Sequence, residues 1–438
     1  MAAANITHCA DCHHGPSGQS DEKFPSREVL PLQARSSSQA SPCLRPSLLI
    51  YAQPPPPPLF SARRSRCVPP QKKHDVILEL DGVRGIAILL VLLFHLELPY
   101  PAGAPRLLFA PLLIGWSGVD LFFVLSGFLI TGILIDTRDC RNYFSSFYMR
   151  RVLRIMPLYL LAVFAYFAVA LPIAHHFGYW SARNGSAQMW FWLHLSNWPA
   201  AFGTVVPFIG HFWSLSVEEQ FYFVWPLVVL FVRPSRLIHV CCGVVVAALA
   251  LRIAFVNSTF IYYLTPFRMD ALGVGCLVAA MVRNPKWSAA VRVRLPWIAA
   301  ANTAVLVGII AATRSPSPFH PWMSTIGYTC FALTYGCFVF AAFAQAGTAS
   351  WLAVQLRSPF LRTFGKYSYA IYIFHPAIMT FLDNVRLRIS RGLPAYEQSA
   401  LAILCMLASI AASYAAARLS WNLLEKRCLA LKSHFAAR

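Results

Sequence analysis

The sequence contains few charged residues: Asp, Glu, Lys and Arg make up only 12% of its 438 positions, whereas soluble domains have about 25%. Acidic residues are especially scarce, with 17 Asp and Glu against 37 Lys and Arg, which gives a net charge of +20. Hydrophobic residues make up 57% of the chain. This composition argues against a water-soluble globular protein and predicts an integral membrane protein.

The excess of positive charge does not indicate nucleic-acid binding, because the basic residues stand between long apolar runs. Basic residues in that arrangement are typical of the cytoplasmic loops of membrane proteins. We therefore expect membrane lipid, and no nucleic acid, as a partner. The twelve cysteines are spread along the chain without a disulfide framework, and several lie within apolar runs, where they pack as small hydrophobic residues.

Residues 1–73 lack any sustained helical or strand periodicity and are rich in Ser and Pro. Such a segment cannot bury a hydrophobic core, so we expect it to be disordered. Cys9, Cys12 and His13 match the attachment pattern of c-type haem, but no folded haem domain surrounds them, and haem is not expected. We predict a disordered extension at 1–73, a membrane domain at 74–428 and a short cytoplasmic tail at 429–438.

Beyond residue 80, apolar runs recur, each near the roughly 20 residues that a helix needs to cross a bilayer. We predict an all-α, polytopic bundle of about ten transmembrane helices. The predicted spans are residues 84–100, 117–135, 153–173, 213–232, 238–255, 268–283, 296–312, 324–345, 367–383 and 398–419. The segment 188–210, rich in Trp and Pro, is interpreted as interfacial or re-entrant and as a candidate cavity wall.

Basic residues place the start of the first span in the cytoplasm, together with the loop at 138–154 between the second and third spans. Every later loop on that side is also basic. The cluster Arg386, Arg388 and Arg391 falls on the other side, against the rule, and the sequence offers no explanation for it.

The first span carries two ionisable residues on one helix face. Arg84 and His95 are eleven positions apart, which on an α-helix is about three turns and a rise of about 16 Å. Ionisable residues within a bilayer indicate a functional site by default, since a guanidinium suits phosphate and an imidazole suits proton transfer. The alternatives are a snorkelling anchor for Arg84 and a neutral, hydrogen-bonded imidazole for His95. We expect both to face one water-filled passage.

A second polar group opens the fourth span. Ser214, Glu218 and Tyr222 are spaced at i, i+4 and i+8, so they form one polar stripe on a helix that is otherwise apolar. The adjacent acids Glu218 and Glu219 need partners or water within a bilayer. The alternative, a helix N-terminus whose dipole favours acids, explains the stripe less well.

The ninth span contains His375 directly before Pro376, at a depth comparable to that of His95. The alternative to a functional role is an imidazole that bonds a carbonyl freed by the proline. At the start of the sixth span, Arg268 and Asp270 are interpreted as a pair that bond each other.

These residues lie within strings that resemble the membrane-bound acyltransferase 3 family, whose members O-acylate sugars and related acceptors. The strings follow the family's order over about residues 78–428: residues 80–85 with His95, 118–130, 147–157, 213–222, 268–275, 368–372 with His375 and Pro376, and Glu425. One such string alone would be weak, but the ordered set is specific.

The resemblance implies ten transmembrane helices in a bacterial inner membrane and a cytoplasmic acyl-CoA donor, commonly acetyl-CoA. It implies a surface glycan, a glycolipid or a lipid-linked precursor as acceptor, a catalytic His95 and an important Arg84. Acyl-CoA is thus a co-substrate, and no bound cofactor or metal is expected. Some members carry a hydrolase-like domain after the last helix; with about 19 residues following Leu419, none is expected here.

We predict that the donor's phosphates are bound by arginines, namely Arg84, Arg150, Arg151 and Arg154. His95 is predicted to act as general base or to carry the acyl group transiently, and Glu218 to orient His95 or bind acceptor hydroxyls. Supporting roles are assigned to Asp81, Ser214, Tyr222, Arg268 and His375.

Two other classes of function fit the same spans. In a secondary transporter or proton-coupled flippase, the intramembrane His and Glu would form a proton relay, but the sequence shows no obvious inverted repeat. A regulatory subunit without chemistry would leave His95 and Glu218 unexplained.

Overall fold

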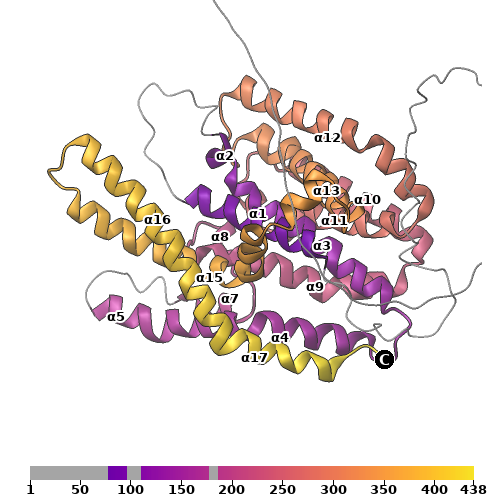
Figure 1. Ribbon diagram of the computed structural model, residues 1–438, viewed down its shortest axis with the longest axis horizontal. Coiled ribbons are helices and arrows are strands. Elements are labelled where there is room, and N and C mark those ends of the chain that lie inside the picture. Colours follow the sequence, from indigo (N-terminus) through magenta and orange to yellow (C-terminus); the bar gives the residue numbers. More distant parts are fainter. Residues whose placement is uncertain (1–76, 96–109, 177–185) are drawn as a thin grey trace, which may run out of the picture. The chain divides into compact units, whose positions relative to one another are not determined.

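The computed structural model describes residues 77–95, 110–176 and 186–438. The extension predicted to be disordered, with its haem-like motif, lies outside these residues. Within the described ranges the chain is helical and contains no strand, and all of them belong to one unit (Figure 1). The all-α prediction is confirmed for this part of the chain.

Ten long helices make up most of the fold in the residues that the structure describes. They are α1 (Leu78–His95), α3 (Gly118–Asp136), α4 (Tyr143–Phe164), α9 (Trp213–Phe231), α10 (Pro234–Ala254), α11 (Thr265–Val282), α12 (Pro285–Thr313), α13 (Tyr328–Ala344), α15 (Pro359–Ile389) and α16 (Ala395–Ser420). Shorter α-helices are α2 (Ala110–Leu113), α5 (Leu171–His176), α7 (Gln188–Trp192), α8 (Asn197–Ala201), α14 (Trp351–Leu356) and α17 (Lys426–Ala430). Helical turns of 3₁₀ or π type are η2 (Gly115–Ser117), η3 (Ala165–Ala170), η4 (Gly210–Phe212), η5 (Thr259–Tyr262), η6 (Met323–Gly327), η7 (Trp421–Glu425) and η8 (Leu431–Phe435).

Each of the ten predicted spans overlaps one of the long helices. Seven helical segments of the described chain are long and apolar enough to cross a membrane: Gly115–Asp136, Tyr143–His176, Pro234–Ala254, Thr259–Val282, Pro285–Thr313, Met323–Ala344 and Tyr396–Phe435. The helices α1, α9 and α15 carry ionisable residues and fall outside this set. The protein is therefore a multi-pass helical membrane protein, while the count of ten crossings stays a prediction.

The segment 188–210 forms the short helices α7 and α8 instead of one long helix, as expected for a segment that does not cross the membrane. It packs against α9, where the hydroxyls of Ser196 and Ser216 are 2.8 Å apart and Gln220 donates to the side-chain oxygen of Asn197 at 2.9 Å. The segment therefore braces α9. We expected this segment to wall a cavity, but the central cavity described below is lined by residues of α1, α3, α4, α9 and α15 and by none of 188–210.

Prolines and capping side chains account for where several helices begin. Ser358 accepts a hydrogen bond from the N–H of Leu361 and so caps α15. In the first turn of a helix the N–H has no intrahelical partner, so a proline there loses no bond. Such prolines start α10, α11, α12 and α15, at Pro234, Pro266, Pro285 and Pro359.

Two helix pairs approach so closely that glycine is required at the contact. A Cβ added at Gly365 of α15 would lie 1.8 Å from the carbonyl oxygen of Asp81 on α1, and one at Gly275 of α11 would lie 2.0 Å from that of Val124 on α3. Small residues permit such backbone contact between membrane helices. The contact between α1 and α15 fixes the walls of the site described below.

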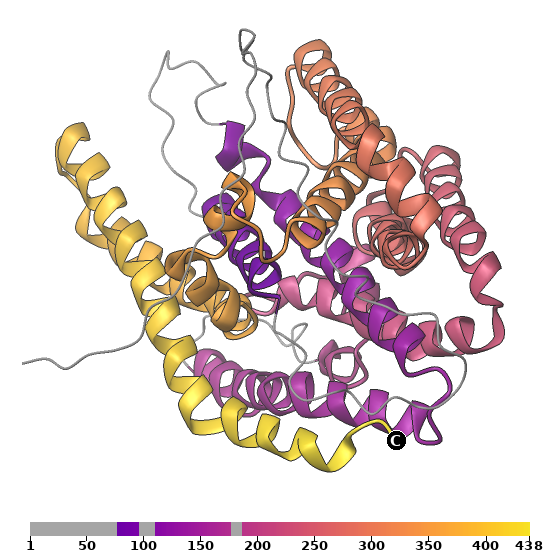
Figure 2. The same cartoon turned by 45° about the vertical axis from the view of Figure 1, so that its right-hand side comes forward.

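Near its C-terminus the chain folds back over α4. Helix α16 runs antiparallel beside α15, and α17 and η8 then continue along α4 (Figures 1 and 2). The hydroxyl of Ser146 donates to the carbonyl of Phe435 at 2.9 Å, and the N–H of Arg438 donates to the side chain of Asn142 at 2.8 Å. This brings the last described segment next to the arginines of α4.

Candidate active site

Two adjoining cavities share the side chains of Arg84 on α1 and of Arg151 and Arg154 on α4. The first, here called the basic cavity, is lined by six cationic side chains: Arg84, Arg151, Arg154, Arg362, Lys366 and Lys432. The second, here called the central cavity, is lined, besides the three shared arginines, by the polar residues Ser126, Ser214, Glu218, Tyr222, Ser368, Tyr369 and Tyr372.

The basic cavity has a strong excess of positive charge. Asp81 is the one acid among the described residues that line it, and it forms an ion pair of 2.7 Å with Arg84. Within the described chain, neither Arg151 nor Arg154 takes part in an ion pair. The volume open to water is about 610 Å³, within the roughly 300–1,000 Å³ of small-molecule pockets. Such a cavity suits a ligand with several phosphates.

The sequence reading found only part of this basic cavity. Arg151 and Arg154 line it as predicted, whereas Arg150 lines neither cavity in the described part of the chain. Arg362, Lys366 and Lys432 were missed as site residues. Their only signal in the sequence is that the positive-inside rule places all three on the same membrane side as Arg84.

The central cavity contains the predicted stripe of α9. Ser214, Glu218 and Tyr222 all line it, as their helical spacing predicted. Glu218 accepts hydrogen bonds from Ser126 of α3 at 2.8 Å and from Tyr222 at 3.2 Å, and Tyr222 also donates to Ser126 at 2.9 Å. Glu218 thus binds these two hydroxyls instead of His95. Ser126 lies in a string that we quoted but was not identified as a site residue.

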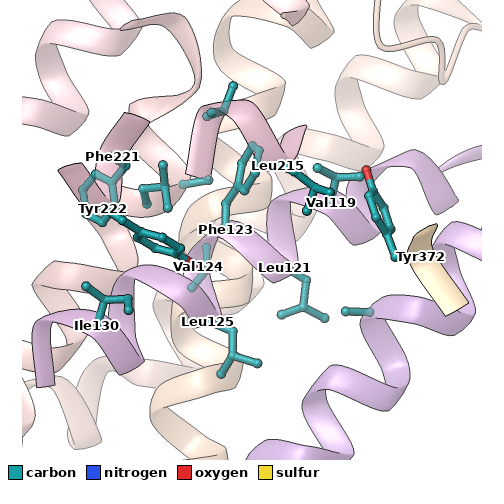
Figure 3. Close-up of a cluster of buried hydrophobic side chains, with 14 of the residues drawn as sticks. Val119, Leu121, Phe123, Val124, Leu125, Ile130, Leu215, Phe221, Tyr222 and Tyr372 are labelled. Atoms are coloured by element: carbon teal, nitrogen blue, oxygen red, sulfur yellow. The ribbon is translucent and has the colours of Figure 1, made fainter. Parts of the chain in front are cut away.

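Apolar residues of α3, Phe122 and Phe123 among them, line the central cavity. Figure 3 shows Phe123 and Val124 lying, in this view, between Tyr222 of α9 and Tyr372 of α15. The hydroxyls of Tyr372 and Ser214 are 2.5 Å apart, and both donate to the carbonyl of His211 at 3.1 and 3.2 Å. The central cavity is therefore lined by hydroxyl groups as well as by the apolar side chains of α3.

Three histidines are in series beyond Tyr372. The ring centroid of His375 is 5.3 Å from that of His211 and 4.9 Å from that of His95. His375 is fully buried, and its Nδ1 is 2.9 Å from the carbonyl oxygen of Tyr372. That carbonyl is the one left without a helical partner by Pro376, as the alternative reading of His375 predicted. The bond does not exclude a functional role, because the same ring contacts His95.

The hydrogen bonds of His95 and His375 define the tautomers of these two imidazoles. The Nδ1 of His95 is 2.9 Å from the carbonyl oxygen of Val91, so this nitrogen must carry the proton in the neutral ring. The lone pair then lies on Nε2. The same argument places the lone pair of neutral His375 on its Nε2. Both rings therefore have the tautomer that a base needs at Nε2.

We expected Arg84 and His95 to face one water-filled passage, and this prediction is wrong. Arg84 lines the central and basic cavities, whereas His95, which is exposed, lines a third cavity formed with α15 and α16. The physical reason is that α15 covers the shared face of α1. It touches α1 at Gly365 beside Asp81 and again where the ring of His375 meets that of His95.

The expected pairing of Arg268 with Asp270 is also wrong. Arg268 pairs with Asp120 of α3 at 2.6 Å, and Asp270 pairs with Arg252 of α10 at 2.7 Å. All four side chains are buried. Residues two apart on a helix point to different sides, so Arg268 and Asp270 reach partners on different helices. Arg252 was missed, although its position within a predicted span is the expected signal of a structural or functional charge.

The site thus combines three chemical environments. A polycationic cavity can bind phosphates, a central cavity presents a carboxylate and several hydroxyls, and a row of imidazoles leads from Tyr372 to His95. Hydrogen-bond donors and a base near one centre are what acyl transfer to a hydroxyl requires.

Comparisons with known proteins agree with this chemistry. The sequence profile of a family described as an acyltransferase domain matches residues 77–418. The chain is 29% identical over 328 residues to the peptidoglycan O-acetyltransferase OatA of Listeria monocytogenes, covering 70% of this chain and 50% of that protein. It is 27% identical over 340 residues to the putative peptidoglycan O-acetyltransferase YrhL of Bacillus subtilis, covering 72% and 50%.

A third relative is the O-acetyltransferase OatA of Staphylococcus aureus, with 26% identity over 326 residues, 70% of this chain and 51% of that protein. The chain spans about half the length of the curated relatives it matches. No solved structure matches it. Because the family profile covers most of the chain, including every helix from α1 to α15, the protein belongs to the membrane-bound acyltransferase 3 family.

Proposed function

We propose that the protein is a membrane-bound O-acyltransferase of the bacterial inner membrane. It moves an acyl group, commonly acetyl, from cytoplasmic acyl-CoA to a hydroxyl of a surface glycan, a glycolipid or a lipid-linked precursor. The observation that carries the proposal is the junction of the basic cavity with the central cavity at Arg84, Arg151 and Arg154. The relatives named for O-acetylation support the same class of reaction.

The donor binds with its phosphates in the basic cavity. Arg84, Arg151 and Arg154 make charge-assisted hydrogen bonds to them, and Lys366 and Lys432 add point charges. The pantetheine arm extends from the arginines into the central cavity. The thioester there lies among the hydroxyls of that cavity. Tyr372 and Ser214 can turn their O–H groups from the carbonyl of His211 to donate to the developing oxyanion.

His95 acts as the general base on the acceptor. The acceptor oxygen forms a bond to the thioester carbonyl carbon while its proton moves to Nε2 of His95. The C–S bond breaks, and the CoA thiolate leaves and takes up a proton. A variant in which a histidine carries the acyl group transiently uses the same groups. Tyr372 and His375 lie between the central cavity and His95, so these two side chains must move aside for the thioester to reach His95.

The decisive experiment is transfer of labelled acetyl from acetyl-CoA to the envelope fraction by the His95→Ala variant. Loss of a general base lowers the rate by about 10²–10⁴-fold. The matched control is His239→Ala, an exposed histidine of α10 that lines none of these cavities; its rate stays at the level of the unmodified protein. Undiminished incorporation by His95→Ala would reject the assignment of His95 as base.

A proton-coupled transporter remains the second candidate, because His211, His375 and His95 contact one another in series, as in a proton relay. Acetyl transfer by the purified protein in detergent, where no gradient exists, separates the two functions. A transporter gives no transfer under these conditions.

A further inference from the structure

We propose that the cavity beside His95, here called the His95 cavity, binds the saccharide acceptor, so that donor and acceptor occupy different cavities of the protein. This inference rests on the proposed function, because it assigns the second substrate of the same reaction. It takes its evidence from a separate part of the fold, the space between the end of α1 and the hairpin of α15 and α16 (Figure 1).

The His95 cavity has a mixed lining. His95 lies at its α1 side, Asp383 and Arg386 come from α15, and Ser409 comes from α16. Met379 and other apolar side chains complete the wall. Saccharides present both hydroxyl groups and apolar ring faces, and binding sites with a few polar groups set in an apolar wall fit such ligands.

Asp383 and Arg386 supply the polar recognition. Nε and Nη2 of Arg386 both lie 2.7 Å from Oδ1 of Asp383, and both side chains keep access to solvent, at 22% and 48% exposure. A carboxylate only accepts hydrogen bonds and a guanidinium only donates them. Held side by side, the two groups offer an acceptor and a donor to neighbouring hydroxyls of one sugar.

The charges of the His95 cavity distinguish its ligand from that of the basic cavity. One cation and one acid are paired here, whereas six cations face one acid in the basic cavity. A polyphosphate such as CoA is attracted to the basic cavity, and a neutral, polyhydroxylated ligand is better suited to the His95 cavity.

This assignment also explains a residue that the sequence left without a reason. Arg386 belongs to the basic cluster that stands against the positive-inside rule. Its place in the lining beside His95 gives it a function on that side of the membrane. Phe381 of α15 and Leu404 and Leu407 of α16 are exposed large hydrophobic residues on the same hairpin. A lipid-linked saccharide can therefore approach along the hairpin, and a soluble one from outside.

The kinetic test uses Arg386→Gln in the full-length protein purified in detergent, with labelled acetyl-CoA and soluble peptidoglycan fragments. We expect the apparent KM for the fragments to rise at least tenfold while the KM for acetyl-CoA stays unchanged. The matched control is Arg388→Gln, on the same helix, exposed and outside the lining, which leaves both values unchanged. An unchanged KM for the fragments, or an equal rise for acetyl-CoA, overturns the proposal.

A binding test needs no substitution, because the natural Cys405 lines the His95 cavity. Alkylation of Cys405 by N-ethylmaleimide is followed by mass spectrometry. Cys428 serves as the internal control, because it is also half-buried but lies on α17, outside the cavity lining. We expect peptidoglycan fragments, or in a second arm lipopolysaccharide core oligosaccharide, to slow alkylation of Cys405 at least fivefold and to leave Cys428 unchanged. Acetyl-CoA should have no effect at Cys405.

The two tests separate this inference from the proposed function. Protection of Cys405 by a saccharide, together with no acetyl transfer by the unmodified protein, would reject the transferase and keep the site. Acetyl transfer without protection of Cys405 by either saccharide would keep the transferase and overturn the acceptor site. Comparison of the two arms identifies which class of saccharide the cavity prefers.

Discussion

Arginine occupies two very different regions of this protein. In the basic cavity, Arg151 and Arg154 lie outside any ion pair of the described chain and face open space. Between α3, α10 and α11, Arg252 and Arg268 are fully buried, and each bonds one aspartate at 2.6–2.7 Å. The basic cavity is lined by more cations than acids. The buried arginines Arg252 and Arg268 are matched by an equal number of aspartates.

The two regions differ in burial and in charge balance: the arginines of the basic cavity face open space with a surplus of positive charge, whereas Arg252 and Arg268 are fully buried and matched by one acid each. Arg268 is enclosed by aromatic rings, with the ring centroid of Tyr328 4.3 Å from its guanidinium carbon, and its charge is matched by Asp120. The charge of Arg268 is therefore neutralised within the fold, although its Nε and Nη1 have no hydrogen-bond acceptor among the described residues. An arginine in a cavity with surplus positive charge, such as Arg151, requires an anion from outside.

The largest effect should follow from breaking the buried pair. Arg268→Met leaves the carboxylate of Asp120 buried without its partner, and such a loss costs about 3–5 kcal/mol. We expect a clear fall in the thermal unfolding midpoint of the purified protein. Arg84→Met serves as comparison, because a partly exposed pair such as Arg84 with Asp81 contributes about 0–1 kcal/mol. Equal midpoints for the two variants would contradict the distinction drawn here.

A smaller effect, confined to the donor, is expected from the basic cavity. Arg151→Gln removes a charge-assisted hydrogen bond to phosphate, which contributes about 1.5–3 kcal/mol, so the apparent KM for acetyl-CoA should rise at least tenfold. Initial rates over a range of acetyl-CoA concentrations measure it. Arg150→Gln, next to it on α4 but outside the lining, should leave this KM unchanged. If both variants behave alike, the cavity does not hold the phosphates.

The smallest effect is expected from salt. Raising the ionic strength from about 0.1 to about 1 M shortens the Debye length from about 10 to about 3 Å, which weakens attraction in the open basic cavity. The KM for acetyl-CoA should therefore rise a few-fold, while the unfolding midpoint changes little because the buried pairs are shielded from ions. A KM that is insensitive to sodium chloride would show that the cavity charges do not attract the donor.

The sequence alone was sufficient to predict the features that depend on the geometry of a single helix. Apolar length predicted where the long helices lie, and the spacing of Ser214, Glu218 and Tyr222 predicted their common cavity. Helical geometry also placed His375 at the level of His95, whose ring it contacts. These inferences need only the regular geometry of an α-helix.

Features that depend on which helices meet could not be predicted. The separation of Arg84 from His95 follows from α15 packing along α1, and nothing in the spacing of the two residues contains that information. The contribution of Lys432 depends on the return of the chain along α4. Arg268 likewise found its acid on α3, a partner that lies 148 residues away in the sequence.

The glycine contact between α1 and α15 sets a narrow tolerance on the whole site. A Cβ at position 365 would lie 1.8 Å from the carbonyl oxygen of Asp81. This clash would force the two helices apart. Asp81 holds Arg84, and the same helix pair brings His375 to His95 at its far end. The hydrogen atom that glycine has in place of a methyl group at this position thus sets the relative placement of the basic cavity and the His95 cavity.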